Sequence, residues 1–209
     1  MKTMFQKTFL KLSGIAAVTL LLAACDNANH SSDPKDVAEE HNDAKFDKAK
    51  EKDAQFLVDI ADIFMKEVKL SELAATQAEA YDIKELGQML KEDNAKWLKE
   101  TEALAGKKMV TLPTDISQAG NDSYRKISDT RGKDFDRDYP AMMVDFHKEA
   151  IEKCEKASAE AQDYEIKTWA GKRLVELRTN LDRSMVCRDK YQGLKNDKEL
   201  KTSNDMRKQ

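Results

Sequence analysis

Glycine and proline are scarce in this chain, with only 7 glycines and 3 prolines among 209 residues. Compact all-β domains need many turns, and these are the two residues on which turns most depend. Charged residues make up 36% of the chain, and long segments are rich in Ala, Glu, Lys and Leu. This composition is typical of amphipathic helices, so the sequence predicts an all-α protein with one folded domain.

Several catalytic signatures are also missing. The chain has no Gly-rich phosphate loop and no Gly-x-Ser-x-Gly elbow, and His147 is the only one of its three histidines within the segments expected to fold. No Glu-x-x-His occurs, which argues against a di-iron oxidase because such sites draw that motif from two helices. We therefore predict that the protein is not an enzyme.

Positive charge is not in excess anywhere along the folded part of the chain. The formal net charge is −3, and it becomes −6 once the segment 1–24 is removed, because that segment carries three lysines and no acidic side chain. Lys and Arg are interleaved with Asp and Glu, which indicates solvent-exposed helix faces. Nucleic-acid binding needs a concentrated basic surface, and we predict no nucleic-acid partner.

The segment 1–24 has the make-up of a secretory signal peptide, with Lys2, Lys7 and Lys11 ahead of an apolar run from 12 to 24. The run is too short to span a bilayer as a stable helix, which takes about 20 apolar residues. It ends in Leu22-Ala23-Ala24-Cys25, which resembles the lipobox of bacterial lipoproteins. The resemblance implies cleavage before Cys25, acylation of that cysteine (palmitate among the acyl groups), and a membrane-anchored protein that faces the periplasm.

Asp26 follows the cysteine directly. In enterobacterial sorting, an aspartate at this position keeps a lipoprotein in the inner membrane, so we expect the inner membrane, with the outer membrane as the alternative. Residues 25–48 contain little to bury and are predicted to form a flexible tether that includes His30 and His41, both interpreted as solvated side chains. We assign residues 49–193 to the folded domain and 194–209 to a polar tail.

Apolar residues recur at helical spacing in four segments of the folded domain. We expect helices over about 50–81, 83–105, 140–161 and 163–193, with 135–139 leading into the third because Pro140 favours a first turn. Residues 106–132 are a long connection with a short helix near 116–129. The segment 78–82 is echoed by the segment 159–163, each at a hairpin tip. The pattern predicts a four-helix bundle of two hairpins joined by a long crossover, as in ferritin-like proteins.

Three phrases carry a family resemblance: Glu67-Val68-x-Leu70, Phe135-Asp136-Arg137-x-Tyr139-x-x-Met142-Met143-x-x-x-His147, and Leu174-x-x-Leu177-Arg178. They resemble a bacterial family catalogued as domain of unknown function four-one-four-two and described as ferritin-like exported or outer-membrane proteins. The family implies a secreted helical bundle but no established reaction. It commonly has Asp-Asp-His where this chain has Glu92-Asp93-Asn94, and a further histidine where Thr179-Asn180 stand.

Four ionisable residues fall near the middle of the predicted bundle. Glu67 and Asp93 interrupt apolar stripes, while His147 and Glu176 lie at a similar depth in the second hairpin. Buried acids persist only when they are paired or coordinate a metal. One hypothesis is therefore a site for a single metal ion or small ligand, made by Glu67, Asp93, His147 and Glu176.

Sulfur and imidazole ligands also share a stripe, at Met143, His147 and Cys154. Such soft ligands suit Cu(I), but residues seven apart lie two helical turns apart, and packing explains the stripe more simply. Cys154 and Cys187 are expected about 25 Å apart along the bundle, so we predict two free thiols rather than a disulfide.

The other hypothesis needs no internal site. In it the protein is a non-enzymatic envelope lipoprotein, without a cofactor, whose bundle surface binds another envelope protein or has a structural role. The sequence alone favours this interpretation, because paired core residues are commoner than metal ligands.

Overall fold

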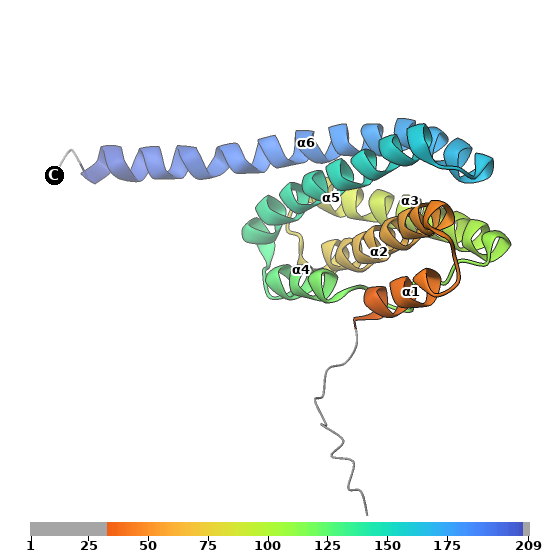
Figure 1. Cartoon of the computed structure of the whole chain (residues 1–209). Coiled ribbons are helices and arrows are strands. Elements are labelled where there is room, and N and C mark those ends of the chain that lie inside the picture. Colours follow the sequence, from red (N-terminus) through yellow and green to blue (C-terminus); the bar gives the residue numbers. More distant parts are fainter. Residues whose placement is uncertain (1–32, 207–209) are drawn as a thin grey trace, which may run out of the picture. The chain divides into compact units, whose positions relative to one another are not determined.

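The computed structural model describes residues 33–206, with side chains through residue 193. These residues form six helices and no strand, which confirms the predicted all-α class (Figure 1). The predicted signal peptide, Cys25, Asp26 and His30 lie outside the described residues. The helices are α1 (Pro34–Asp43), α2 (Lys48–Gln77), α3 (Tyr81–Lys108), α4 (Gln118–Ser128), α5 (Gly132–Glu160) and α6 (Tyr164–Met206).

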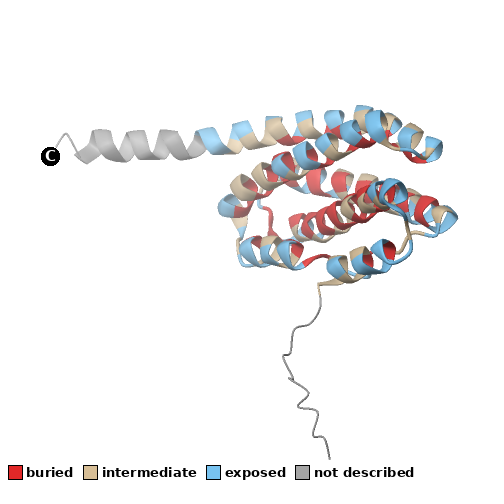
Figure 2. Cartoon of the chain, viewed as in Figure 1, coloured by how far each residue is buried: buried red, intermediate tan, exposed pale blue. Residues whose placement is uncertain are grey.

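Four long helices build the core as two hairpins, α2 with α3 and α5 with α6. The first helix of each hairpin also packs against the first helix of the other, and α3 meets α6 less closely. Each long helix turns its buried face inward, as Figure 2 shows. Within residues 33–206, no helix is both long and apolar enough to span a bilayer.

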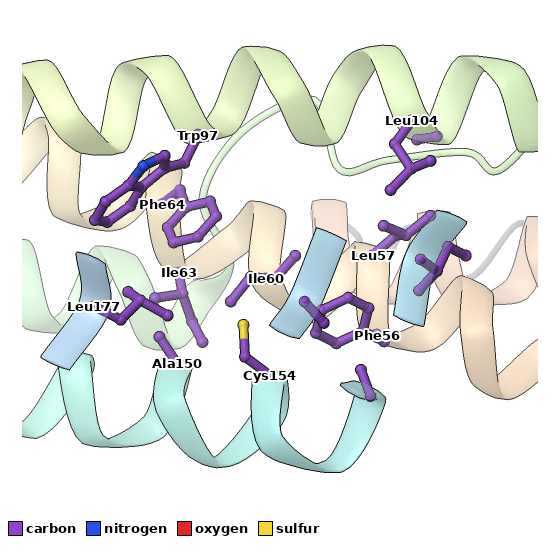
Figure 3. Packing of buried hydrophobic residues seen from close by; sticks show 14 residues of the cluster. Phe56, Leu57, Ile60, Ile63, Phe64, Trp97, Leu104, Ala150, Cys154 and Leu177 are labelled. Atoms are coloured by element: carbon purple, nitrogen blue, oxygen red, sulfur yellow. The ribbon is translucent and has the colours of Figure 1, made fainter. Parts of the chain in front are cut away.

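The apolar core consists of two clusters. The first cluster, drawn in Figure 3, packs Phe64 against Trp97 with ring centroids 5.5 Å apart and includes Cys154. The second cluster contains Leu90, Met143 and a stacked pair of rings, Phe135 and Tyr139, with centroids 5.3 Å apart. Burying these side chains supplies the main stabilisation of the bundle, at about 1.5–3 kcal/mol for each large residue.

Residues 34–43 form α1, so the prediction of a flexible tether through residue 48 was wrong for this stretch. Asp33 caps the helix, and its first residue is a proline, for which the missing N–H costs nothing at that position. Ala38 and Asn42 are buried, and the Asn42 carboxamide exchanges two 2.8 Å hydrogen bonds with the backbone of Thr111. Two buried contacts therefore dock a helix that its composition did not reveal. His41 lies on its exposed side.

The predicted short helix in the crossover is present as α4. Ser117 caps it by accepting a hydrogen bond from the Gly120 N–H. The carboxylate of Asp62, on α2, accepts hydrogen bonds from both the N–H and the hydroxyl of Ser117, at 2.7 and 2.9 Å. The start of α4 is thus fixed to the bundle core.

Several helix boundaries differ from the prediction: α2 ends at Gln77 rather than near residue 81, and α3 begins and ends two to three residues beyond its predicted range. Helix α5 begins at Gly132 and continues through Pro140, because burial of Phe135 and Tyr139 holds the turns before the proline in place. Helix α6 continues to Met206 rather than ending near residue 193. The stretch from 194 to 206 contains no glycine or proline, so nothing in its backbone chemistry stops a helix.

The two halves of the bundle repeat each other in a register that pairs Tyr81 with Tyr164, the first residues of α3 and α6. The residues directly after the preceding helices, Ala78 and Ala161, have extended backbone with ψ of 140° and 138°. Each half places a short helix before a long hairpin, so α1–α3 corresponds to α4–α6. The sequence echo was real, but its predicted alignment, which paired Ala78 with Ala159, was off by two positions.

Each hairpin tip is held by an aspartate from the other hairpin. Asp136 accepts hydrogen bonds from the N–H groups of Glu79 and Ala80 at 3.1 and 3.0 Å. Asp53, its counterpart in the repeat, accepts those of Gln162 and Asp163 at 3.1 and 2.7 Å. Because both carboxylates are buried, each satisfies two backbone donors at a helix start, and the reciprocal pair fixes how the two hairpins are staggered.

Candidate functional site

A polar layer lies between the two apolar clusters, with one residue from each of three long helices. We call Glu67 of α2, Asn94 of α3 and His147 of α5 the mid-bundle layer. Glu67, Asn94 and His147 have no exposed surface. Along their helices they stand between Phe64 and Leu70, Leu90 and Trp97, and Met143 and Ala150, all of them buried and apolar.

Glu67 is the centre of this layer. Its Oε2 accepts a hydrogen bond from Nδ2 of Asn94 at 3.0 Å and lies 3.4 Å from Nδ1 of His147. The Asn94 amide also donates to the carbonyl oxygen of Leu90 at 2.8 Å. Three helices therefore meet at one carboxylate.

His147 has one ring nitrogen engaged and one without a partner. Its Nδ1 lies 2.8 Å from the carbonyl oxygen of Met143, one turn earlier. A carbonyl oxygen can only accept, so Nδ1 carries the hydrogen and donates it. In the neutral imidazole, Nε2 is then left with a free lone pair.

The layer contains three buried atoms with unfilled hydrogen-bonding capacity. Glu67 Oε1, Asn94 Oδ1 and His147 Nε2 have no partner among the described residues. All three can act as acceptors or metal ligands, and they belong to the three side chains that meet at Glu67. A buried polar atom without a partner costs about 1–3 kcal/mol, so three such atoms in one layer need an explanation beyond packing.

Burial raises the pKa of Glu67, and the nearby His147, Lys66 and Asn94 oppose that rise without cancelling it. The ionised carboxylate therefore lacks full compensation in this environment. A positive charge placed beside it would supply the missing stabilisation.

Two of the four residues predicted for a metal site are brought together, namely Glu67 and His147. Asp93 points away from the layer, where its Oδ2 accepts a hydrogen bond from Asn180 at 2.9 Å. Glu176 pairs with Arg173 and lies 3.7 Å from Lys96. Neither enters the layer as predicted. On α3 the inward position belongs to the next residue, Asn94, because each step along a helix turns the side chain by about 100°.

Asn94 was missed although the sequence contained a signal for it. It follows buried Leu90 by four residues and precedes buried Trp97 by three, which is the spacing of one helix face. A polar residue on such a face is as informative as an acid. Asn180 has the same kind of position, because it follows buried Leu177 by three residues.

The sulfur-containing stripe is divided between the two clusters. Met143 packs in the second cluster, whereas Cys154 packs in the first. Burial raises the pKa of Cys154 to about 12, despite the opposing charge of Arg173. Both Cys154 and Cys187 are free thiols, as predicted. Among the described residues, no three His, Cys, Asp or Glu side chains gather closely enough to hold an ion.

Comparison with known proteins adds a family and a fold. A family model described as a domain of unknown function, DUF4142, matches residues 38–185. No curated protein matches the chain. Among solved structures, the chain is similar to CopM in the Cu(II)-bound form, with 14% sequence identity and a TM-score of 0.57 over 66% of this chain and 97% of that one. At this identity the likeness concerns the helical-bundle fold alone.

Proposed function

We propose that the chain, which belongs to the DUF4142 family of domains of unknown function, binds one divalent transition-metal ion in its mid-bundle layer. The proposed ligands are His147 Nε2, the Glu67 carboxylate and the Asn94 carboxamide oxygen. Its role is to hold or carry the ion, and no reaction is assigned to it.

The free Nε2 of His147 carries the proposal. Metal-bound histidines typically donate their other ring N–H to a carboxylate or a backbone carbonyl, which fixes the ring and leaves the ligating nitrogen unprotonated. His147 has this arrangement, with Nδ1 donating to Met143. The unpartnered oxygens of Glu67 and Asn94 supply the accompanying oxygen donors.

The donor types restrict the ion. One imidazole nitrogen with carboxylate and amide oxygens suits Zn(II) or Cu(II) better than Cu(I), which prefers sulfur. Ca²⁺ takes six to eight oxygens, more than this layer can offer. The copper named for CopM belongs to that protein, but it makes Cu(II) and Zn(II) the first two ions to test here.

We further propose that a lipid on Cys25 anchors the protein to the periplasmic side of a membrane, with Asp26 favouring the inner membrane. The sequence from Lys2 to Asp26 supports this part of the proposal. Fractionation of cells that express Asp26→Ser tests the sorting role, because an unchanged distribution would contradict it.

A second candidate function is binding of another envelope protein. It is favoured by α6, where Val175 and Val186 are each 69% exposed. Eleven residues apart, they lie on the same helix face, so a partner could cover both. Cross-linking in intact cells should then recover one recurrent partner that Val175→Asp with Val186→Asp abolishes.

Metal content tests the main proposal. The full chain, purified without chelators and incubated with Zn(II) or Cu(II), should retain one ion per chain by elemental mass spectrometry. Glu67→Gln and His147→Gln should lose it. Asp93→Asn and Glu176→Gln are matched controls, since both were plausible ligands but lie outside the layer, and they should keep the ion. Equal retention by all four variants would refute the site.

A further inference from the structure

A groove of about 1000 Å³ opens between the start of α2 and the end of α5, far along the bundle from the second cluster. Its lining includes the buried apolar side chains of Phe56 and Ala157. Five lysines also line it, at positions 48, 52, 153, 156 and 167, against three acidic residues, Asp53, Asp59 and Glu160. A basic lining of this kind is unusual on a chain whose formal net charge is negative.

Three of the lysines are uncommitted. Lys153 pairs with Asp59 at 2.8 Å, and Lys167 donates to the carbonyl oxygen of Ala159 at 2.8 Å. Lys48, Lys52 and Lys156 are exposed and have no hydrogen bond or ion pair with any described residue. The carboxylate of Asp53 in the groove is occupied by the tip of the second hairpin. The groove therefore presents three ammonium groups without a hydrogen bond or ion pair, more than the one remaining carboxylate of its lining, Glu160, can balance.

The repeat of the fold shows what fills the matching place in the other half. In the register that pairs Tyr81 with Tyr164, the lysines at 52, 153 and 156 correspond to Phe135, Leu70 and Leu73, all in the second cluster or packed against it. There α4 packs against both α2 and α5, whereas α1 packs against α2. In the other half of the repeat, the equivalent place is apolar and is covered by α4. In this half it is lined by lysines and is left open.

We propose that this lysine groove binds the phosphate headgroups of anionic phospholipids in the membrane that anchors the chain. Seven residues lie between Cys25 and Asp33, so the two are at most about 28 Å apart along the chain. The next helix borders the groove, since Lys35 lies 2.6 Å from Asp59 in its wall. The groove is therefore within reach of the bilayer surface.

The charge distribution favours this orientation. Each lysine near an anionic surface is attracted to it, and the three free lysines act together. The rest of the chain is acidic and is repelled by the same surface, so the groove is the face that turns towards it. Because the lipid keeps the domain near the bilayer, a weak local affinity is enough to orient it. The inference rests on the proposed lipid on Cys25 and is independent of the metal site.

Lysine footprinting on the full lipidated chain tests the groove. The protein is reconstituted into vesicles of phosphatidylcholine alone or mixed with phosphatidylglycerol, treated briefly with an acetylating reagent, and analysed by mass spectrometry. We expect acetylation of Lys48, Lys52 and Lys156 to slow at least threefold in the anionic vesicles. Lys84, Lys99 and Lys126 are internal controls, because they are also exposed and unpaired among described residues, and their rates should not change.

Equal changes at both sets of lysines, or no change at either, would overturn the proposal. Protection by inorganic phosphate in neutral vesicles, matching that in anionic ones, would assign the groove to a soluble anion and would also overturn it. A chain that stays out of neutral vesicles would refute the lipid anchor instead. In that case co-sedimentation with anionic vesicles decides the groove: the native chain should bind, and Lys48→Gln with Lys52→Gln and Lys156→Gln should not.

Discussion

The two halves of the bundle agree at their tips and differ in their middle. Asp53 and Asp136 occupy equivalent positions and make equivalent pairs of hydrogen bonds. In the same register, Glu67 corresponds to Ala150, Asn94 to Leu177 and His147 to Phe64, each buried and apolar. Each polar residue of the mid-bundle layer therefore has an apolar residue at the equivalent position of the other half.

This difference separates what the fold requires from what it does not. Features shared by both halves, such as the aspartates and the alanines at the hairpin turns, set the length and stagger of the hairpins. The apolar counterparts show that packing at the depth of the layer does not demand polar residues. A cluster of polar atoms that packing does not explain is the strongest indication of a binding site in this chain.

The largest expected loss of stability comes from removing an aspartate that holds a hairpin tip. Asp136→Ala leaves two buried backbone N–H groups without an acceptor and should lower the free energy of unfolding by about 3 kcal/mol. Asp53→Ala should cost a similar amount, because its bonds are equivalent. Urea titration followed by circular dichroism measures both. A loss in one variant but not the other would show that the two tips are not equivalent.

A smaller loss of stability should follow when one residue is replaced by the residue at the equivalent position of the other half. Gly87 corresponds to Ala170, but a Cβ added at Gly87 would lie 2.3 Å from that of Ala74. Gly87→Ala should therefore destabilise the fold by about 2 kcal/mol through overpacking.

Gly106→Ala is the matched control, because nothing lies near its added Cβ, and it should stabilise by about 0.5 kcal/mol. Thermal unfolding distinguishes the two variants. A Gly87→Ala protein as stable as the parent would contradict the close approach of α2 and α3.

Replacing the mid-bundle layer by the apolar residues of the other half should raise the free energy of unfolding rather than lower it. The triple variant Glu67→Ala, Asn94→Leu and His147→Phe gives each layer position the residue of its counterpart. Replacing a buried polar network by apolar residues of suitable volume is often stabilising, and we expect a gain of about 1 kcal/mol without metal.

The triple variant should also bind no metal. Denaturant unfolding with and without Zn(II) measures both properties. A loss of several kcal/mol would mean that the layer is needed for the fold, and the argument from asymmetry would fail.

The smallest expected effect is a difference in alkylation rate between the two free thiols, which does not involve the stability of the fold. Burial raises the pKa of Cys154 to about 12, and it also raises that of the half-buried Cys187. A raised thiol pKa lowers the thiolate fraction at neutral pH, and Cys154 is in addition shielded from solvent. At pH 8 iodoacetamide should alkylate Cys187 at least tenfold faster than Cys154. Comparable rates in the native protein would contradict the packing of Cys154 in the first cluster.

Much of the fold could be predicted from the sequence, because helical periodicity extends over every long helix. Helix α1 could not, since its docking depends on two side chains, Ala38 and Asn42, within a polar stretch. The register was off by two positions because matching letters at the tips outweighed the hydrogen bonds to Asp53 and Asp136, which only the structure reveals.

The candidate site was half predicted. Glu67 was found because it interrupts an apolar stripe, and His147 because it is a histidine at a similar depth in the second hairpin. Asp93 was predicted because it was placed in the apolar stripe of its helix, but one helical step decides which residue faces inward, and that residue is Asn94. Glu176 was placed by depth alone, and depth does not determine which way a side chain points.

The most direct test of the central claim is anomalous diffraction from crystals of the protein grown with Zn(II) or Cu(II), with data collected on both sides of the metal absorption edge. We expect one strong anomalous peak inside the bundle, within about 2.2 Å of His147 Nε2 and close to the Glu67 carboxylate. A peak elsewhere, or a metal-free layer in crystals that carry the ion on their surface, would contradict it.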